Sequence, residues 1–249
     1  MNLRLILIFL VLFPLLSIAQ ATNNKLTLVD DFEWSEGKIM LSSGEELIGL
    51  VKFNDRNGVL AYHDGDNSRP FGPRSVLGFD FFDERVQQQR IFYSLEDEDP
   101  QTNVMRPLFF ELLRDYKTFA IMLRTDRTEV KEKMATSPGG YNNGVYYNPS
   151  INNSSLELSQ TQTVCILDDN GKVFPYFKCT KKEDGRKSWF SNDDVRTKNK
   201  MINDDLIREY ISQTDYSKIV QYADENKLDF KKLDDFLKIL KYYDSLIAD

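Results

Sequence analysis

The stretch TQTVCILDDNGKVFPYFKC, Thr161–Cys179, is the segment whose pattern decides the fold. Two runs rich in apolar and β-branched residues, Thr161–Leu167 and Lys172–Cys179, flank the turn sequence Asp168-Asp169-Asn170-Gly171. Asn-Gly accepts the positive φ values that tight hairpin turns require. The stretch therefore predicts an antiparallel hairpin. Because Pro175 has no amide hydrogen to give to a ladder, we expect its strand to lie at a sheet edge or to carry a bulge.

Further short strands are predicted on the amino-terminal side of this hairpin. In the run nearest to it, Phe119, Ile121 and Leu123 recur with period two, which is typical of a strand. Closely spaced strands with Gly, Asn and Asp turns favour an antiparallel β sandwich or a partly open barrel. The expected strands are Lys38–Leu41, Glu45–Phe53, Val59–Tyr62, Val76–Phe82, Arg90–Ser94, Leu108–Leu113 and Lys117–Arg124.

The apolar period becomes helical after Ser191. One apolar stripe includes Leu206 and Ile211, a second includes Ile219 and follows a cap at Thr214 or Asp215, and a third follows a cap at Asp229. Amphipathic helices of this kind share a core. The class is therefore α+β: a β-rich domain over 26–187, followed by a small C-terminal helical bundle within 188–249.

An insert near 127–160 has no apolar period and is rich in Gly, Asn and Tyr. We predict that it is flexible. Its aromatic rings and amides suit stacking on sugars or contact with a partner surface, so Tyr141, Tyr146 and Tyr147 are candidate binding residues. The alternative is a variable insertion without a function.

The first 19 residues have the pattern of a cleavable signal peptide. Arg4 supplies a positive charge, Leu5–Leu16 is apolar, and Ser17 and Ala19 occupy the positions that a signal peptidase reads. The apolar run is shorter than the roughly 20 residues that a membrane-spanning helix needs. We therefore expect export and cleavage before Gln20, with no stable membrane insertion afterwards; an uncleaved anchor is the alternative. The expected location is the periplasm or cell envelope, with the outside of the cell as the alternative.

The charge balance of the chain argues against a nucleic-acid partner. The chain has 32 basic and 39 acidic residues, and Arg4 is the only charged residue of the leader, so cleavage leaves 31 basic residues and a net charge of −8. A surface with this excess of carboxylates repels phosphate backbones and anionic lipid faces.

The two cysteines, Cys165 and Cys179, could form a disulfide in an oxidising compartment. If Asn170-Gly171 is a two-residue loop, Cys165 lies opposite Tyr176 and Cys179 lies opposite Gln162. The two sulfur atoms are then three positions apart on opposite faces, which is too far for a disulfide. A longer loop or a bulge would change this register, so the pairing stays open.

No set of residues in the sequence indicates catalysis, a metal or a cofactor. His63 is the only histidine, and it lies in a polar turn, whereas zinc sites need several imidazole or thiolate ligands. The acidic loops Asp64–Asn67 and Glu96–Asp99 lack the ligand spacing of a calcium-binding EF-hand loop. No glycine-rich loop has the context of a nucleotide site. We therefore predict no catalytic residue, no metal site and no cofactor.

The order of these segments resembles that of the uncharacterised exported proteins that are common in Bacteroidota. The resemblance implies a cell-envelope setting and a β-rich part followed by helices, and it supplies no activity or site residues. The segments that carry it are Ser17–Gln20, Gly37–Leu41, Gly44–Gly49, Ser75–Phe79, Phe109–Leu113 and Tyr242–Leu246.

These observations favour a non-enzymatic binding or interaction module whose partner is an envelope protein or a glycan. The alternative function is a carboxylate-dependent hydrolase that acts on an envelope or extracellular polymer, because paired carboxylates can lie far apart in a sequence. A structural assembly subunit is a third possibility.

Overall fold

The computed structural model describes residues 33–54, 58–99, 102–132, 141–142, 145–146, 155–184 and 196–248. The predicted signal peptide, 1–19, lies outside these residues, and so does much of the insert.

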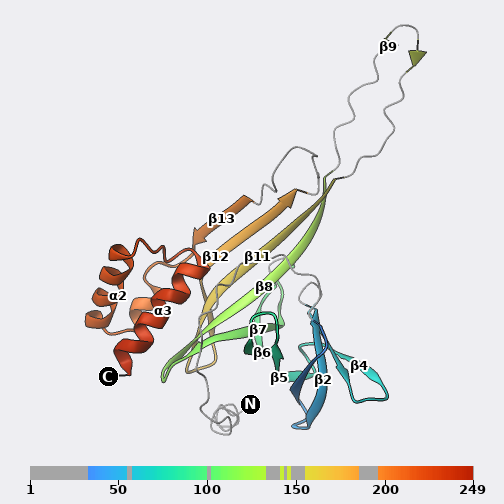
Figure 1. Cartoon of the computed structure of the whole chain (residues 1–249), viewed down its shortest axis with the longest axis horizontal. Helices are drawn as coiled ribbons and strands as arrows, with labels where there is room; N and C mark the ends of the chain where they lie inside the picture. The colour runs from blue at the N-terminus through green and yellow to red at the C-terminus, as the bar shows by residue number, and fades with distance from the viewer. Residues whose placement is uncertain are drawn as a thin grey trace.

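The main element of the fold is one antiparallel sheet of 11 strands (Figure 1). Its strand order is β13-β12-β11-β8-β7-β6-β5-β1-β2-β3-β4. The strands are β1 (Ser35–Leu41), β2 (Glu46–Asn54), β3 (Val59–His63), β4 (Ser68–Phe71), β5 (Val76–Asp83), β6 (Gln88–Glu98), β7 (Met105–Asp115), β8 (Phe119–Glu132), β11 (Ser155–Asp168), β12 (Val173–Asp184) and β13 (Arg196–Met201). A separate pair joins β9 (Tyr141–Asn142) to β10 (Val145–Tyr146).

This sheet confirms a β-rich fold but not a β sandwich. Its end strands, β13 and β4, do not pair with each other, so the sheet is open. Within the described ranges, no second large sheet packs against it. The finer expectation, a β sandwich or a partly open barrel, is not confirmed; the described residues form one open sheet that curls.

The amino-terminal half of the sheet curls over one of its faces. The ring of Phe53 in β2 lies 5.0 Å from that of Phe92 in β6 and 5.7 Å from that of Phe109 in β7, although β2 neighbours neither strand. A flat sheet would hold these rings several strand spacings of about 4.8 Å apart. The curl therefore encloses an aromatic core: Ile39, Leu47, Val51, Phe53, Leu60, Tyr62, Val76, Phe79, Phe81, Phe92 and Phe109.

The other face of the sheet has a core of its own between β6 and β12. Phe110, Met122 and Cys165 are fully buried there, and partly buried side chains from β6 and β12 pack against them. Strands β6 and β12 are four positions apart in the order and yet come into contact. The sheet therefore curls in the opposite sense here, and this second curl buries the cluster.

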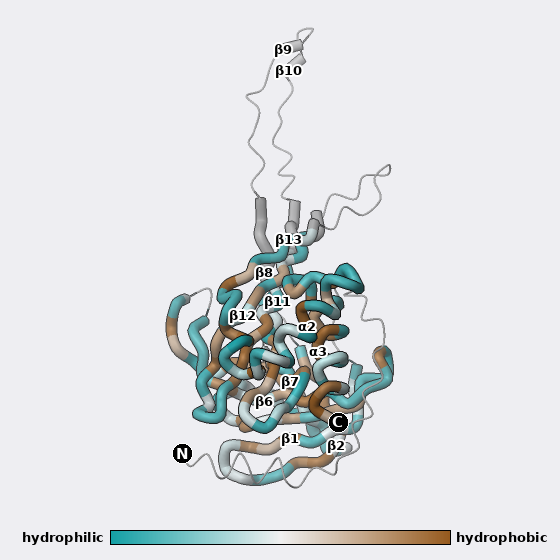
Figure 2. Tube along the Cα trace, turned by 90° about the vertical axis from the view of Figure 1, so that its left-hand side faces the viewer, coloured by the Kyte–Doolittle hydropathy of each residue, from teal (hydrophilic) through white to brown (hydrophobic). Residues whose placement is uncertain are grey.

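The carboxyl-terminal helices cover the outer face of β8, β11 and β12 (Figures 1 and 2). They are a 3-10 turn, η1 (Leu206–Glu209), and the α-helices α2 (Gln213–Glu225) and α3 (Leu233–Ile247). Phe236 of α3 packs its ring 5.2 Å from that of Phe177 in β12. Two helices and one turn confirm a small helical part, but not the expected bundle. Among the described helices, none combines the length and apolarity needed to cross a bilayer.

The N-cap residues of α2 and α3 differ from the predicted ones. Ser212, not Thr214 or Asp215, caps α2, and its hydroxyl accepts a 3.1 Å hydrogen bond from the amide of Asp215. At α3 the capping position is Lys232 instead of Asp229.

The decisive hairpin forms as predicted and carries the expected bulge. Gly171 has a φ of 80° in its turn, a value at which glycine avoids the strain of a Cβ atom. The register shifts beside Pro175, which lies opposite Cys165. Strand β12 lies between β11 and β13, so Pro175 marks a bulge and not an edge strand.

Two further differences concern the predicted boundaries. Strands β8 and β11 continue into the insert, where Gln160 pairs with Arg127 and Ser155 pairs with Glu132. The segment 196–201, expected within the helical region, forms β13 on the edge of the sheet.

Candidate functional site

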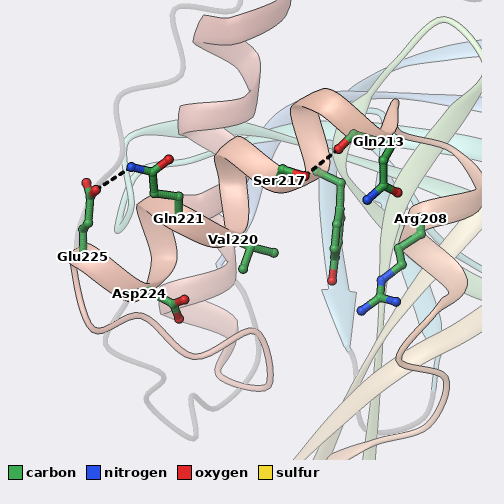
Figure 3. A pocket seen from close by; sticks show the side chains of 8 residues that line it. Arg208, Gln213, Ser217, Val220, Gln221, Asp224 and Glu225 are labelled. Atoms are coloured by element: carbon green, nitrogen blue, oxygen red, sulfur yellow. Dashed lines mark hydrogen bonds between the residues drawn. The ribbon is translucent and has the colours of Figure 1, made fainter.

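A shallow depression of about 500 Å³ lies along α2 (Figure 3). Apart from Arg208, which lies in η1, all of its lining residues belong to α2. They are Arg208, Gln213, Tyr216, Ser217, Val220, Gln221, Asp224 and Glu225.

The helical period explains why these side chains share one surface. Ser217 and Gln221 follow Gln213 at intervals of four, and such residues lie on one face of a helix. The buried residues Ile219 and Ala223 point to the sheet instead. The packing of α2 on the sheet thus turns a polar stripe outward.

An arginine–tyrosine pair forms one end of the depression. The guanidinium carbon of Arg208 lies 4.8 Å from the centre of the Tyr216 ring, and Arg208 Nη1 lies 2.9 Å from Asp205 Oδ1. Hydrogen bonding to Tyr216 and the charge of Asp205 raise the pKa of Arg208 above its ordinary value. The guanidinium is therefore charged, and these contacts orient it.

Amides and carboxylates form the other end, with Val220 between the two ends (Figure 3). Gln221 Nε2 donates a 2.8 Å hydrogen bond to Glu225 Oε1. One turn earlier, the hydroxyl of Ser217 donates a 2.9 Å bond to the carbonyl oxygen of Gln213. The depression therefore offers donors and acceptors that are already oriented along the helix axis.

A second hollow is too small to hold a substrate. It has a volume of about 20 Å³ and lies among Phe53, Phe92, Phe109, Leu123, Arg90, Glu111 and Thr125. A space of that size accommodates one water molecule. The charged side chains in its wall are paired with each other: Arg90 donates two hydrogen bonds, of 2.7 and 2.6 Å, to the carboxylate of Glu111.

This pair belongs to a buried network of charges. Asp83 accepts two hydrogen bonds from the Arg85 guanidinium, of 3.0 and 2.9 Å, and one of 3.4 Å from Arg90. Burial favours the protonated form of Asp83, but Arg85 and Arg90 outweigh it and lower its pKa. The carboxylates of this network are therefore paired with arginines through charge-assisted hydrogen bonds.

Carboxyl groups with raised pKa values do not line either hollow. Burial raises the pKa of Asp80, Asp115, Asp126 and Asp234, which is the kind of shift that a general acid needs. None of the four belongs to the lining of a hollow. The carboxylate-dependent hydrolase therefore stays a prediction without support from this geometry.

Two of the three candidate tyrosines lie in the separate strand pair of β9 and β10. Tyr141 lies in β9 and Tyr146 in β10, where their backbones pair, and Tyr147 lies outside the described residues. Their role in binding stays a prediction. The depression could not be predicted from the sequence, because a stripe of Gln, Ser and Asp has the same pattern as any solvated helix face.

Both cysteines are free and buried in the structure. Cys179 lies opposite Gln162 as expected, whereas the bulge places Cys165 opposite Pro175 and not Tyr176. Cys165 belongs to the cluster with Phe110, and Cys179 belongs to the cluster under the helices, so they occupy opposite faces of the sheet. The structure has no disulfide between them, because the bulge shifts the register without bringing the two thiols to one face.

His63 ends β3 and has structural partners. Its ring lies 5.8 Å from that of Trp34, and its Nδ1 lies 3.2 Å from the hydroxyl of Ser68. Across the described ranges, no group of three or more His, Cys, Asp or Glu side chains is placed to hold a metal.

The sequence matches no protein-family model, and neither the curated proteins nor the solved structures give a match.

Proposed function

We propose that this protein is an exported, non-enzymatic binding module that binds a macromolecule of the cell envelope through the depression on α2. The single observation that carries the proposal is the depression itself: an open surface along α2, most of whose lining residues are polar. An open surface suits a ligand that is larger than the site, whereas small-molecule and catalytic sites are enclosed and mainly apolar.

Export is part of the proposal and rests on the leader, Met1–Ala19. We expect the protein to reach the periplasm or cell envelope with Gln20 as its first residue. Sequencing the amino terminus of protein isolated from fractionated cells tests this step. Full-length protein in the cytosol, with Met1 present, would contradict it.

Binding is tested by retention of envelope material on the immobilised protein. Val220 lies at the centre of the depression and is only partly buried, so Val220→Arg fills it without removing a core side chain. Lys241→Gln changes an exposed residue of α3 outside the depression and is the matched control. We expect the wild type and the control to retain the same component, and Val220→Arg to lose it while keeping its circular dichroism spectrum. Equal retention by all three proteins, or retention by none, would contradict the proposal.

A further inference from the structure

Strand β13 has a neighbour on only one side. In the described part of the chain it pairs with β12 alone, at the end of the sheet, and no backbone hydrogen bond joins its other side to a described residue (Figure 1). An open edge of this kind presents a row of N–H and C=O groups that can pair with an added strand. The opposite edge strand, β4, has four residues and contains Pro70, which has no N–H to donate. The six residues of β13 include no proline, so β13 is the edge that can accept a strand.

Lysine side chains line one face of this edge. Lys178 of β12 lies opposite Lys200 of β13, and Lys198 lies two residues before Lys200. Because alternate residues of a strand share a face, the three side chains lie on the same side of the sheet. Lys198 and Lys200 are exposed, and among the described residues no carboxylate forms an ion pair with any of the three. The edge therefore carries a basic strip, although the chain has more acidic than basic residues.

Protection of the edge explains only part of this pattern. Lysines on an edge strand prevent most other strands from pairing with it, and Lys198 and Lys200 have that effect. Lys178 belongs to β12, which has a neighbour on both sides, so it protects no edge. Like charges that lie directly opposite each other on neighbouring strands are destabilising. A cost of this kind, without a compensating carboxylate, is expected where the positive charge serves binding.

The open backbone and the lysines together select the class of partner. A lipid or a sugar lacks the regularly spaced N–H and C=O groups that pair with a strand edge, whereas an extended polypeptide has them. An added strand places its side chains opposite those of β13. Carboxylates at alternate positions would then face Lys198 and Lys200, whereas the β13 strand of a second copy would place lysines beside lysines. The charge therefore disfavours pairing of two copies through β13 and favours an acidic partner.

We propose that β13 is a docking edge for an acidic, extended segment of a partner protein, which joins the sheet as a further strand. Main-chain hydrogen bonds to β13 hold the segment, and its carboxylates pair with Lys198 and Lys200. Thr197 and Asn199, on the other face of β13, are uncharged, so the segment needs acidic residues only at alternate positions. No residue of β13 lines the depression on α2, so this inference does not depend on the proposed function.

The direct test is a titration of the isotope-labelled protein, followed by amide NMR, with a capped octapeptide of alternating glutamate and threonine. One comparison peptide has glutamine in place of glutamate. The other keeps every glutamate but has N-methylated backbone amides, so it carries the charge and cannot donate to an edge. We expect saturable shifts and slower hydrogen exchange in β13 with the first peptide alone. No saturable shift in β13 with that peptide, or shifts confined to other elements, would overturn the inference. Equal binding of the N-methylated peptide would do the same, since it would show a site for anions of any kind.

Substitutions of the lysines test the role of charge. Lys198→Gln/Lys200→Gln is expected to weaken binding of the acidic peptide about tenfold, because two charge pairs across the new strands are lost. Lys178→Gln should weaken it by a smaller factor and should also stabilise the protein to urea, since it removes a like-charge pair. Lys241→Gln, an exposed lysine of α3, is the matched control and should leave the affinity unchanged. Equal affinity of the wild type and the double variant, with the spectrum of β13 intact, would refute the acidic partner.

Discussion

The hydroxyl of Tyr116 donates a 2.8 Å hydrogen bond to Asp244 and thereby joins the turn between β7 and β8 to the last turn of α3. Arg114 Nε donates a 3.0 Å bond to the other oxygen of the same carboxylate. A carboxylate near the carboxyl end of a helix is unfavourable by itself, because the helix dipole is negative there. The two donors offset that cost, and the carboxylate holds the helical layer to the sheet.

Replacement of Asp244 is therefore expected to loosen α3. Hydrogen bonds to charged groups contribute about 1.5–3 kcal/mol, so Asp244→Ala should lower the free energy of unfolding by about that amount in urea denaturation. Tyr116→Phe should cost about 1 kcal/mol. Combining the two changes should cost less than their sum, since they remove the same bond. Lys241→Gln is the control, and strict additivity would contradict the coupling.

Breaking the buried ion pair between Arg90 and Glu111 is expected to lower the free energy of unfolding by more than the loss of Asp244. Glu111 is 8% exposed and accepts both hydrogen bonds from the guanidinium. Removing one partner of a buried pair costs about 3–5 kcal/mol, and without Glu111 the buried Arg90 keeps only its longer, 3.4 Å bond to Asp83 among the bonds described. We expect Glu111→Ala to lose that amount and the apolar double variant Arg90→Met/Glu111→Leu to lose much less. Equal losses in the two proteins would show that the pairing does not matter.

The local pattern of the chain predicts its hairpins well. Asn170-Gly171 specifies a turn, and the run of Phe119, Ile121 and Leu123 specifies one face of a strand. The sense of each curl depends instead on contacts between distant strands, such as that of Phe53 with Phe92. Period-two patterns say which side chains share a face, but not whether that face meets a second sheet or curls on itself. A sandwich and a partly open barrel were both left open for this reason.

Strand β13 was missed because its sequence, RTKNKM, has no apolar alternation. Such lysine-rich strands are typical of sheet edges, where charge prevents pairing with other chains. The cap of α2 was misplaced because Ser212, Thr214 and Asp215 are all good capping residues. Ser212 caps the helix, and its hydroxyl also donates a 2.7 Å hydrogen bond to the Asp215 carboxylate. Only the docking of the helix on the sheet selects among them.

Asp80 provides a test of pH dependence. It is 5% exposed, and burial raises its pKa above the ordinary value of 3.8, against the hydrogen bond from Gln89 and the charge of Lys38. A group whose folded pKa exceeds its unfolded pKa takes up a proton more readily in the folded state. The wild type therefore gains stability as the pH falls through the folded pKa toward 3.8.

The isosteric variant Asp80→Asn lacks this dependence. The free energy of unfolding of Asp80→Asn minus that of the wild type should be largest at pH 7 and should become smaller as the pH approaches 4. Urea denaturation of both proteins at pH 7, 5.5 and 4 measures the difference. A relative stability that increases toward acid pH would show that the ionised carboxylate is the form that the fold stabilises.

The reactivity of the two cysteine thiols tests whether the described pairing of β11 and β12 holds in solution. Burial raises the pKa of Cys165 to about 12 and raises that of Cys179 as well. The sulfur of Cys179 also donates a 3.2 Å bond to the carbonyl oxygen of Lys231, beside the start of α3. Since the thiolate is the reactive form, we expect almost no labelling of the native protein by a thiol reagent at pH 8.

In urea without a reductant, the same protein should release two thiols per chain, and Cys179→Ser should release one. Native labelling of Cys179 is expected to rise in Asp244→Ala, because the start of α3 leaves the sheet more often, while Cys165 on the opposite face stays protected. Recovery of no thiols in urea until a reductant is added would mean that the two cysteines are bridged. That result would require β12 to pair with β11 in another register, and it would overturn the assignment of the two sulfur atoms to opposite faces.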